Sequence, residues 1–557
     1  MMLLKICKVP VCCCLLFISL FAAAQTRDRI YIQSDRSGYV AGETIWLKAY
    51  LFSAFSPGSL GTNLLIDMVD ESGKRILAGS LPVMGGTASG NIDLPLRIAQ
   101  GIYFIRAYTK AQPSNTDYSF AVKPVYVFNP SIVKSTQILA PVSDYQCSFR
   151  PSSGNLVVGL VNLVYVSAYD LSGRPAVVEG TIVNTKNEES DVFKTDNNGK
   201  GKFAISPLPG EQYMARIRFA DGTLKTYNLP KPDQNKVLIG ISDLPKAKLF
   251  NVLIPEALRT GAMMHLRGFM DNNIVFEKNF SASVDHVSAR IPVDELPSGL
   301  LQLVVTDSKK QKLGEANTFV LADSSIMSLQ FHADTLNLSP GGKNVFSFVL
   351  PEDITGSFSV AITDYDKTLY TDENNIITGL LLNQDSHNNS FVSNSAIFNV
   401  AKKADLDMAL GSTDWLDQSL YAGTNSVIND SDFIAIRGKI FNKGNRKPLT
   451  KGDITFMYTT RDSVTSMLTS PMAKDGSFSL RQLIFEGKQV FRYSVNGNKW
   501  DEIDMSLDTT KPEDVLRLPF NRSGMMVDRT VFADERKINR QLKLTQLTWQ
   551  IQFHQQG

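Results

Sequence analysis

The chain has 557 residues and a nearly balanced charge, with 57 Lys and Arg against 55 Asp and Glu. Such a balance provides no electrostatic field that would favour nucleic acid or anionic lipid as a partner. Hydrophobic residues make up 43% of the chain, which at this length is enough for several hydrophobic cores.

The first 24 residues have the pattern of an export signal. Lys5 and Lys8 form a positive region, residues 11–21 are apolar, and Ala22-Ala23-Ala24 offers a small-residue cleavage site. The apolar run of about eleven residues is shorter than the roughly 20 that span a bilayer. We therefore expect cleavage after Ala24 and an exported mature chain without a transmembrane span.

Cysteine usage is sparse beyond this signal, where only Cys147 of the five cysteines remains. No intramolecular disulfide can then form, so the stability of the mature chain must come from hydrophobic cores. Cys12, Cys13 and Cys14 come before the apolar run and not at the cleavage site, which disfavours attachment of a lipid.

From residue 25 onward the chain has the pattern of short β-strands. Runs of alternating apolar and polar residues, rich in Val, Ile, Phe and Tyr, are bounded by Gly, Pro, Asn and Asp. Three of these runs follow a Leu-Pro pair and then Gly101, Gly210 or Gly299. These glycines are spaced by about 100 residues, the size of one β-sandwich domain. Asp-Gly type clusters such as Asp196-Asn-Asn-Gly199 lack the ligand pattern of a calcium loop and predict hairpin turns.

Breaks in the strand pattern divide the chain into a signal and five β-sandwich units. Leu-rich runs with helical spacing at 374–385 and 404–418 predict a short helical excursion attached to the fourth unit. The predicted fold class is all-β, with tandem Ig-like sandwiches. The expected units are a signal peptide (1–24), sandwiches at 25–129, 130–232, 233–321 and 322–430, a smaller sandwich at 431–507, and a partly disordered or helical tail at 508–557.

Catalytic patterns are weak throughout. None of the five histidines forms a helical zinc pair, and no Gly-x-Ser-x-Gly elbow or phosphate-binding loop occurs. We expect no catalytic, cofactor-binding or metal-binding residues, and surface positions for His265, His286, His332, His387 and His554. Two acidic pairs, Asp405 with Asp407 and Asp364 with Asp366, are the remaining candidates for paired-carboxylate chemistry, although solvated acids at turns or helix ends explain them better.

Tryptophans are the residues best suited to stack on a sugar ring, and the chain has Trp46, Trp415, Trp500 and Trp549. We expect Trp46 to face a core within its strand and Trp415 to pack between helices.

The stretch Tyr39-Val-Ala-Gly42-Glu43 and the alternating strand after it resemble the β-sandwich unit of the α2-macroglobulin family. The chain from about residue 28 to 507 resembles exported Bacteroidota proteins in which such units precede a carboxypeptidase-regulatory-like domain, a small transthyretin-like sandwich. The blocks that carry this resemblance are 149–159, 358–364, 376–382, 406–415, 436–449 and 475–478. Proteins of this group are often linked to a TonB-dependent receptor plug domain, which this sequence does not contain. The Cys-Gly-Glu-Gln thioester cluster of complement-type macroglobulins is also absent, since Ser148 follows Cys147.

The resemblance implies a non-enzymatic binding or scaffolding protein of the periplasm or outer membrane. Its implied partner is an envelope protein such as a TonB-dependent receptor, with peripheral membrane association. Two alternatives stay open. One is a protease-interacting macroglobulin relative that acts without a thioester, through a cleavable segment at 383–399. The other is a carbohydrate-binding or carbohydrate-active module.

Overall fold

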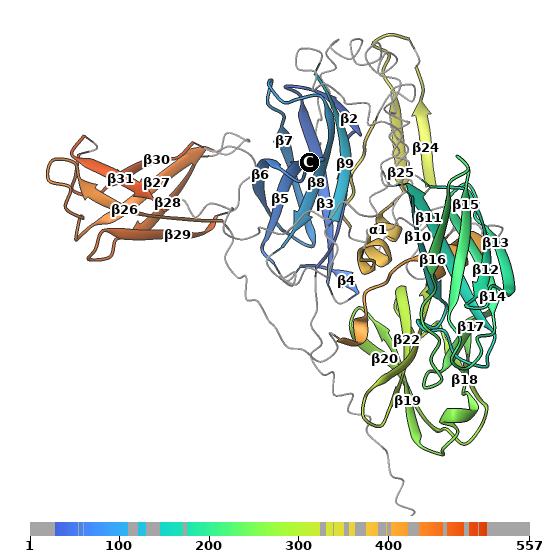
Figure 1. Ribbon diagram of the computed structural model, residues 1–557. Helices are drawn as coiled ribbons and strands as arrows, with labels where there is room; N and C mark the ends of the chain where they lie inside the picture. The colour runs from blue at the N-terminus through green and yellow to red at the C-terminus, as the bar shows by residue number, and fades with distance from the viewer. Residues whose placement is uncertain are drawn as a thin grey trace, which may run out of the picture.

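In the described part of the chain, the computed structural model places four β-sandwiches, one further pair of strands and one helical segment (Figure 1). The predicted signal peptide and all of the predicted tail except Asp508 lie outside the described residues. The residues described are 28–53, 55–59, 61–109, 121–129, 145–170, 175–322, 330–337, 339–349, 356–362, 375–387, 397, 403–420, 434–459, 465–483, 490–499 and 501–508.

Sandwich 1 encloses a core between two sheets. One sheet has the order β1-β3-β4 with β7 also paired to β3, and the other has the order β2-β9-β8-β5-β6. Tyr39, Ile45 and Leu51 are fully buried between them. The strands are β1 (Arg29–Ser34), β2 (Gly38–Val40), β3 (Thr44–Ser53), β4 (Ser56–Pro57), β5 (Asn63–Asp70), β6 (Arg75–Pro82), β7 (Thr87–Asp93), β8 (Gly101–Tyr108) and β9 (Ala121–Phe128).

Trp46 is exposed on strand β3, with 46% of its surface accessible, so the expectation of a core position was wrong. Side chains alternate between the two faces of a strand. On β3 the inward set contains Ile45 and Leu47, and the outward set contains Trp46 and Lys48. Because the buried face has little tolerance for the lysine charge, the register that turns Lys48 outward also turns Trp46 outward.

Sandwich 2 packs the three-stranded sheet β10-β11-β14 against the four-stranded sheet β13-β12-β15-β16. On β14 the inward residues Phe203 and Ile205 are buried, while Lys200 and Lys202 lie on the outer face. The strands are β10 (Tyr145–Pro151), β11 (Asn162–Asp170), β12 (Val178–Asn184), β13 (Glu189–Lys194), β14 (Lys200–Ile205), β15 (Tyr213–Phe219) and β16 (Leu224–Asn228).

The Asp-Gly clusters form tight turns, as predicted. In the turn between β13 and β14, the Asp196 carboxylate accepts hydrogen bonds from the backbone N–H groups of Asn198 and Lys200 at 2.9 and 2.8 Å. Gly199 has a φ of +69°, and a Cβ there would overlap the carbonyl oxygen of Ala168. Glycine is therefore the residue that this turn requires.

Sandwich 3 packs the sheet β17-β18-β21 against the sheet β20-β19-β22-β23. Strand β22 is buried on both faces because the helical segment covers its outer side. A 3₁₀ turn, η1 (Glu256–Leu258), follows β18. The strands are β17 (Leu238–Leu244), β18 (Ala247–Leu253), β19 (Met263–Met270), β20 (Asn273–Ser281), β21 (His286–Pro292), β22 (Gly299–Asp307) and β23 (Lys312–Val320).

The helical segment, residues 375–387 and 403–420, contains helices within both predicted runs. Asn375 caps the first helix through hydrogen bonds from the backbone N–H groups of Ile377 and Thr378. Its elements are α1 (Ile376–Leu381), η4 (Asn383–Asp385), α3 (Lys403–Ser412) and η6 (Gln418–Leu420). In the described part of the expected fourth sandwich, the paired strands are β24 (Gln330–Thr335) and β25 (Val345–Val349).

The C-terminal sandwich is a smaller pair of sheets, β29-β26-β31 and β28-β27-β30, around a core that contains Phe456 and Phe478. Figure 1 draws it at the left, away from sandwiches 2 and 3. The strands are β26 (Ile434–Asn442), β27 (Asp453–Thr459), β28 (Thr465–Pro471), β29 (Ser477–Leu483), β30 (Arg492–Val495) and β31 (Ile503–Leu507). The sheets as a whole confirm the predicted all-β class with tandem Ig-like sandwiches.

Candidate functional site

The histidines that the structure describes lie at the surface, as predicted. His265 is hydrogen-bonded to Asn279 and His286 to Asp285, while His332 and His387 are exposed. His554 lies outside the described residues. Within the described part of the chain, no group of three or more His, Cys, Asp or Glu side chains is placed to hold a metal ion. The same residues contain no helix that is long and apolar enough to cross a membrane.

The paired-carboxylate candidates do not form a site in the described residues. Asp405 and Asp407 lie two positions apart on α3, a spacing that turns two helical side chains in different directions. Asp407 lies 3.9 Å from the Lys403 ammonium, as a helix-surface ion pair does. Asp364, Asp366, Trp500 and Trp549 lie outside the described residues. Trp415 is buried and packs against Leu410, as predicted.

The segment 383–399, expected to be an exposed cleavable loop, begins in the interior. Asn383, Gln384, Asp385 and Ser386 are all buried. That part of the expectation was wrong, because the side chains of Gln384 and Asp385 form contacts with sandwich 1. Of the remaining residues of this segment, His387 is exposed and Ile397 is partly buried.

The strongest polar site joins sandwich 1, sandwich 3 and the helical segment. The guanidinium of Arg29, on β1, donates to Asp271 Oδ1 through Nε and Nη2, both at 3.0 Å. Its Nη1 donates to Asp385 Oδ2 at 2.9 Å and to the carbonyl oxygen of Leu380 at 3.0 Å. Burial disfavours the charged guanidinium, but the two carboxylates outweigh it and raise the pKa of Arg29. We name Arg29, Asp271 and Asp385 the interdomain lock.

Two buried glutamines complete these contacts. The amide of Gln384 accepts a hydrogen bond from the backbone N–H of Ile30 at 3.1 Å and donates to the carbonyl oxygen of the same residue. Gln418 accepts from the backbone N–H of Asn272 at 3.3 Å, and its own backbone N–H donates to Gln302 at 2.8 Å. Each glutamine side chain thus forms hydrogen bonds to backbone groups of a sandwich, as a neighbouring strand would.

Helix α3 lies on the outer face of the sheet β10-β11-β14. A Cβ on Gly411 would overlap the ring of Tyr165, so glycine allows the helix to approach β11 closely. Arg150, on β10, forms an ion pair with Asp414 just after the helix. The helical segment therefore contacts sandwiches 1, 2 and 3.

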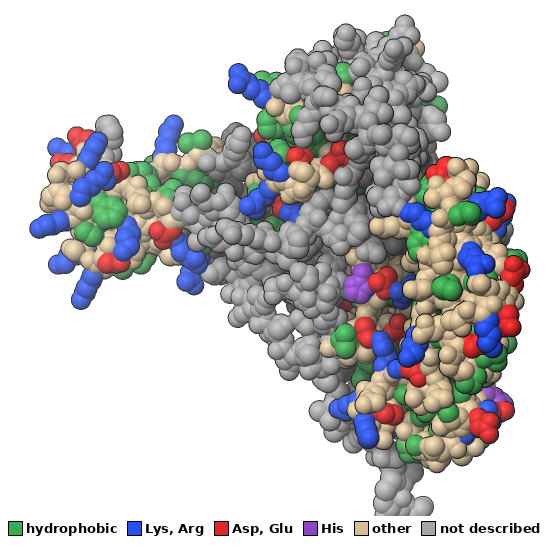
Figure 2. Space-filling view, viewed as in Figure 1, with side chains coloured by type: hydrophobic (Ala, Val, Ile, Leu, Met, Phe, Trp, Pro, Cys, Tyr) green, Lys and Arg blue, Asp and Glu red, His purple; other side chains and the backbone are tan. Residues whose placement is uncertain are grey.

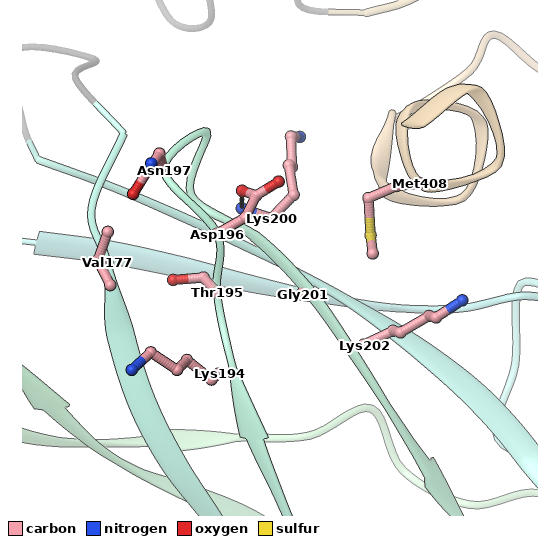
Figure 3. A pocket seen from close by; sticks show the side chains of 9 residues that line it. All are labelled: Val177, Lys194, Thr195, Asp196, Asn197, Lys200, Gly201, Lys202 and Met408. Atoms are coloured by element: carbon pink, nitrogen blue, oxygen red, sulfur yellow. Dashed lines mark hydrogen bonds between the residues drawn. The ribbon is translucent and has the colours of Figure 1, made fainter. Parts of the chain in front are cut away.

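An open cleft of about 580 Å³ lies between α3 and the turn that joins β13 to β14 (Figure 3). Met408 extends from α3 towards the strand that carries Lys200 and Lys202. The cleft is lined by Val177, Lys194, Thr195, Asp196, Asn197, Lys200, Gly201, Lys202 and Met408. The lining has three cations against one carboxylate. This cleft could not be predicted from the sequence, because its two walls are about 200 residues apart in the chain.

On the face seen in Figure 2, basic and acidic side chains are interspersed over sandwiches 2 and 3. This mixture agrees with the balanced charge of the sequence and contrasts with the basic cleft. Cys147, on β10, is half-buried, and burial raises the pKa of its thiol to about 12.

Comparison with solved structures gives matches over 86% of the chain to bacterial alpha-2-macroglobulins. The Salmonella protein reacted with methylamine is 9% identical with a TM-score of 0.17, and the native Escherichia coli protein is 11% identical with a TM-score of 0.17. A tetra-tandem repeat from the extending region of a large adhesion protein is 9% identical, with a TM-score of 0.15 and 98% of its own length covered.

The chain spans about two fifths of the length of these alpha-2-macroglobulins, 39% of the Salmonella and 38% of the E. coli protein. At such identities and TM-scores the matches do not extend to function. No family model matches the chain. The search of curated proteins also gives no match.

Proposed function

We propose that this chain is a non-enzymatic binding or scaffolding protein of the cell envelope. The observation that carries the proposal is the helical segment, which binds sandwiches 1 and 3 through buried polar contacts and sandwich 2 through the close approach of Gly411 to Tyr165 and the partly exposed Arg150–Asp414 ion pair. Buried ion pairs with full hydrogen bonding hold one geometry, because any displacement leaves a charge desolvated and unpaired. Three sandwiches held in this way present their sheet edges and end loops in a constant arrangement, as a scaffold must.

The proposed cellular location and the proposed partner are supported by the sequence. The export pattern of residues 1–24 and the resemblance to exported Bacteroidota proteins support a periplasmic or outer-membrane location. The same resemblance supports an outer-membrane partner such as a TonB-dependent receptor, engaged during uptake or surface assembly. The partner would contact several sandwiches at once. The interdomain lock would then affect binding without touching the partner, because it holds these sandwiches in one arrangement.

In-cell crosslinking of the full chain tests this proposal in the organism that makes it. We expect envelope fractions to contain the chain crosslinked to an outer-membrane receptor, with crosslinks from at least two sandwiches. The variant Arg29→Met keeps every surface lysine but loses the lock, and should lose the crosslinks from one of those sandwiches. Arg267→Met, which removes an exposed ion pair with Glu277, is the matched control and should keep them. A chain confined to the cytoplasmic fraction would refute the proposal.

The protease-interacting alternative makes a different prediction. It requires cleavage confined to the part of 383–399 that follows Ser386, compaction of the chain, and retention of the protease. The burial of 383–386 favours the scaffold, because those residues hold the helical segment in place and are not accessible to a protease. Incubation with several proteases, followed by gel filtration of the products, distinguishes the two. Cleavage at many sites without protease retention would exclude the alternative.

A further inference from the structure

Four cations around the helical segment have carboxylate partners. Arg29 faces Asp385, Arg150 faces Asp414, Lys312 faces Asp417, and Lys403 faces Asp243. Lys200 lies beside the same segment on the outer face of β14. Its ammonium donates to Ser167 Oγ at 2.9 Å and lies 5.3 Å from the centre of the Tyr169 ring. Among the described residues, no carboxylate lies within ion-pair distance of it.

A half-buried ammonium without a counter-charge is an unfavourable arrangement, because burial removes water from the charge. A hydroxyl and an aromatic ring replace only part of that hydration. Burial lowers the pKa of Lys200 to about 8, although the Asp196 carboxylate acts in the opposite direction.

A second cation faces the same cleft. Lys202 is two residues along β14 from Lys200, so both side chains leave the strand on the same face, about 7 Å apart at their Cα atoms. The strand opposite supplies polar partners, since Ser167 pairs with Lys200 and Tyr165 with Lys202 in the ladder. Met408 and Val177 add apolar surface to the lining.

The other charges at the cleft leave this positive character in place. Lys194 is engaged with Glu179 at 2.9 Å, outside the cleft. The Asp196 carboxylate accepts two backbone N–H groups through one oxygen and keeps its charge, so Lys200 and Lys202 together still leave a net positive charge beside it. From the side of α3, Lys403 is bound to Asp243 and also lies 3.9 Å from Asp407. Asp405 is the remaining acid of that helix.

We propose that the cleft between β14 and α3 binds a small oxyanion, a carboxylate or a phosphate group, whose apolar remainder packs against Met408 and Val177. Lys200 and Lys202 would hold the anion. A bound anion supplies the counter-charge that this contact lacks. It would therefore also strengthen the docking of α3 on sandwich 2, where Arg150 and Asp414 already form an ion pair.

Acylation of amines, read residue by residue by mass spectrometry at pH 8, tests the proposal on the purified full chain. Only a neutral amine reacts, so Lys200 should be labelled faster than the exposed Lys309 in chloride buffer. Inorganic phosphate or butyrate at the same ionic strength should slow the labelling of Lys200 about fivefold, the change that follows when an anion raises an amine pKa by about one unit. The labelling of Lys309 should not change.

The two anions separate the possible sources of the group. Protection by phosphate alone indicates a phosphate site, protection by butyrate alone indicates a carboxylate with an apolar chain, and protection by both indicates a general oxyanion site. Lys202→Gln should reduce the protection, whereas Lys186→Gln, an exposed lysine of the same sandwich, should leave it intact. Unchanged labelling of Lys200 with both anions, or equal slowing at Lys309, would overturn the proposal.

Discussion

Arg29 is the residue on which the most contacts between distant parts of the chain depend. It has only 6% of its surface exposed, and its guanidinium satisfies two carboxylates and one carbonyl oxygen from two other parts of the chain. Removal of one partner from a buried ion pair leaves the other charge desolvated, which costs about 3–5 kcal/mol. The lock is therefore more sensitive to substitution than any surface ion pair of this protein.

We predict that Arg29→Met lowers the free energy of the first unfolding transition in urea by about 3–5 kcal/mol. Arg267→Met breaks a half-exposed ion pair with Glu277 and should change the free energy of this unfolding transition by less than about 1 kcal/mol. Urea titrations followed by tryptophan fluorescence measure both values. Equal effects of the two variants would mean that the lock contributes no more than a surface pair.

Lys200 gives a pH-dependent prediction. Its folded pKa of about 8 is below the usual value near 10.4 in an unfolded chain. Between pH 8 and about 10.4 the unfolded state therefore binds more protons at this group than the folded state does. The free energy of unfolding of the wild type consequently rises with pH across this range. Lys200→Met removes the titration. We predict that it raises the melting temperature at pH 7 and that the gain shrinks at pH 10. A gain that is independent of pH would contradict this account.

Cys147 gives the third prediction at this scale. Burial raises the pKa of its thiol to about 12, so almost no thiolate exists at pH 8. Reaction with a maleimide should be slow in the folded chain and fast after unfolding in guanidinium. The mass of the chain after timed labelling measures both rates. Rapid labelling of the folded chain would show that the thiol is accessible and ionised.

At the scale of elements, the docking of α3 depends on one glycine. A methyl group at Gly411 would overlap the Tyr165 ring, so Gly411→Ala must push the helix away from β11 even though alanine favours helix formation. We predict faster amide hydrogen exchange in α3 and in β11 of this variant. Gly79→Ala on β6, where no atom lies within 4 Å of the added methyl group, is the control. Unchanged exchange in α3 would show that the helix is not held by this contact.

Strands and helices could be predicted because their signals are local. Alternation identified strands such as β3, and the spacing of leucines identified the segments that form α1 and α3. The outward position of Trp46 could also have been predicted, since Lys48 lies on the same face of the strand, but the alternation by itself allowed either Trp46 or its neighbours Ile45 and Leu47 to face the core. Contacts of the helical segment could not be predicted, because Arg29 and Asp385 are 356 residues apart and each looks like an ordinary surface charge in its own stretch.

At the scale of the molecule, the helical segment adds to direct contacts between sandwiches, such as those of Arg29 with Asp271 and of Ser153 with Ile239. Its apolar side packs on the outer face of sandwich 3 through Leu382, Leu410 and Trp415, and its polar groups bind sandwiches 1 and 2. Tandem domains are joined by default through mobile linkers, so a buried connector of this kind is a specific device. The proposed scaffold function therefore depends on the rigid arrangement of the sandwiches that the helical segment maintains.

The most direct test of this account is a distance distribution between sandwich 1 and sandwich 3. Spin labels at Lys74→Cys and Lys309→Cys, in the chain from Gln25 onward with Cys147→Ser, place probes on exposed turns of the two sandwiches. Double electron–electron resonance should give one narrow distance distribution, and adding Arg29→Met should broaden it while Arg267→Met leaves it narrow. A broad distribution in the chain with an intact lock would contradict the central claim that the helical segment holds the sandwiches as one rigid body.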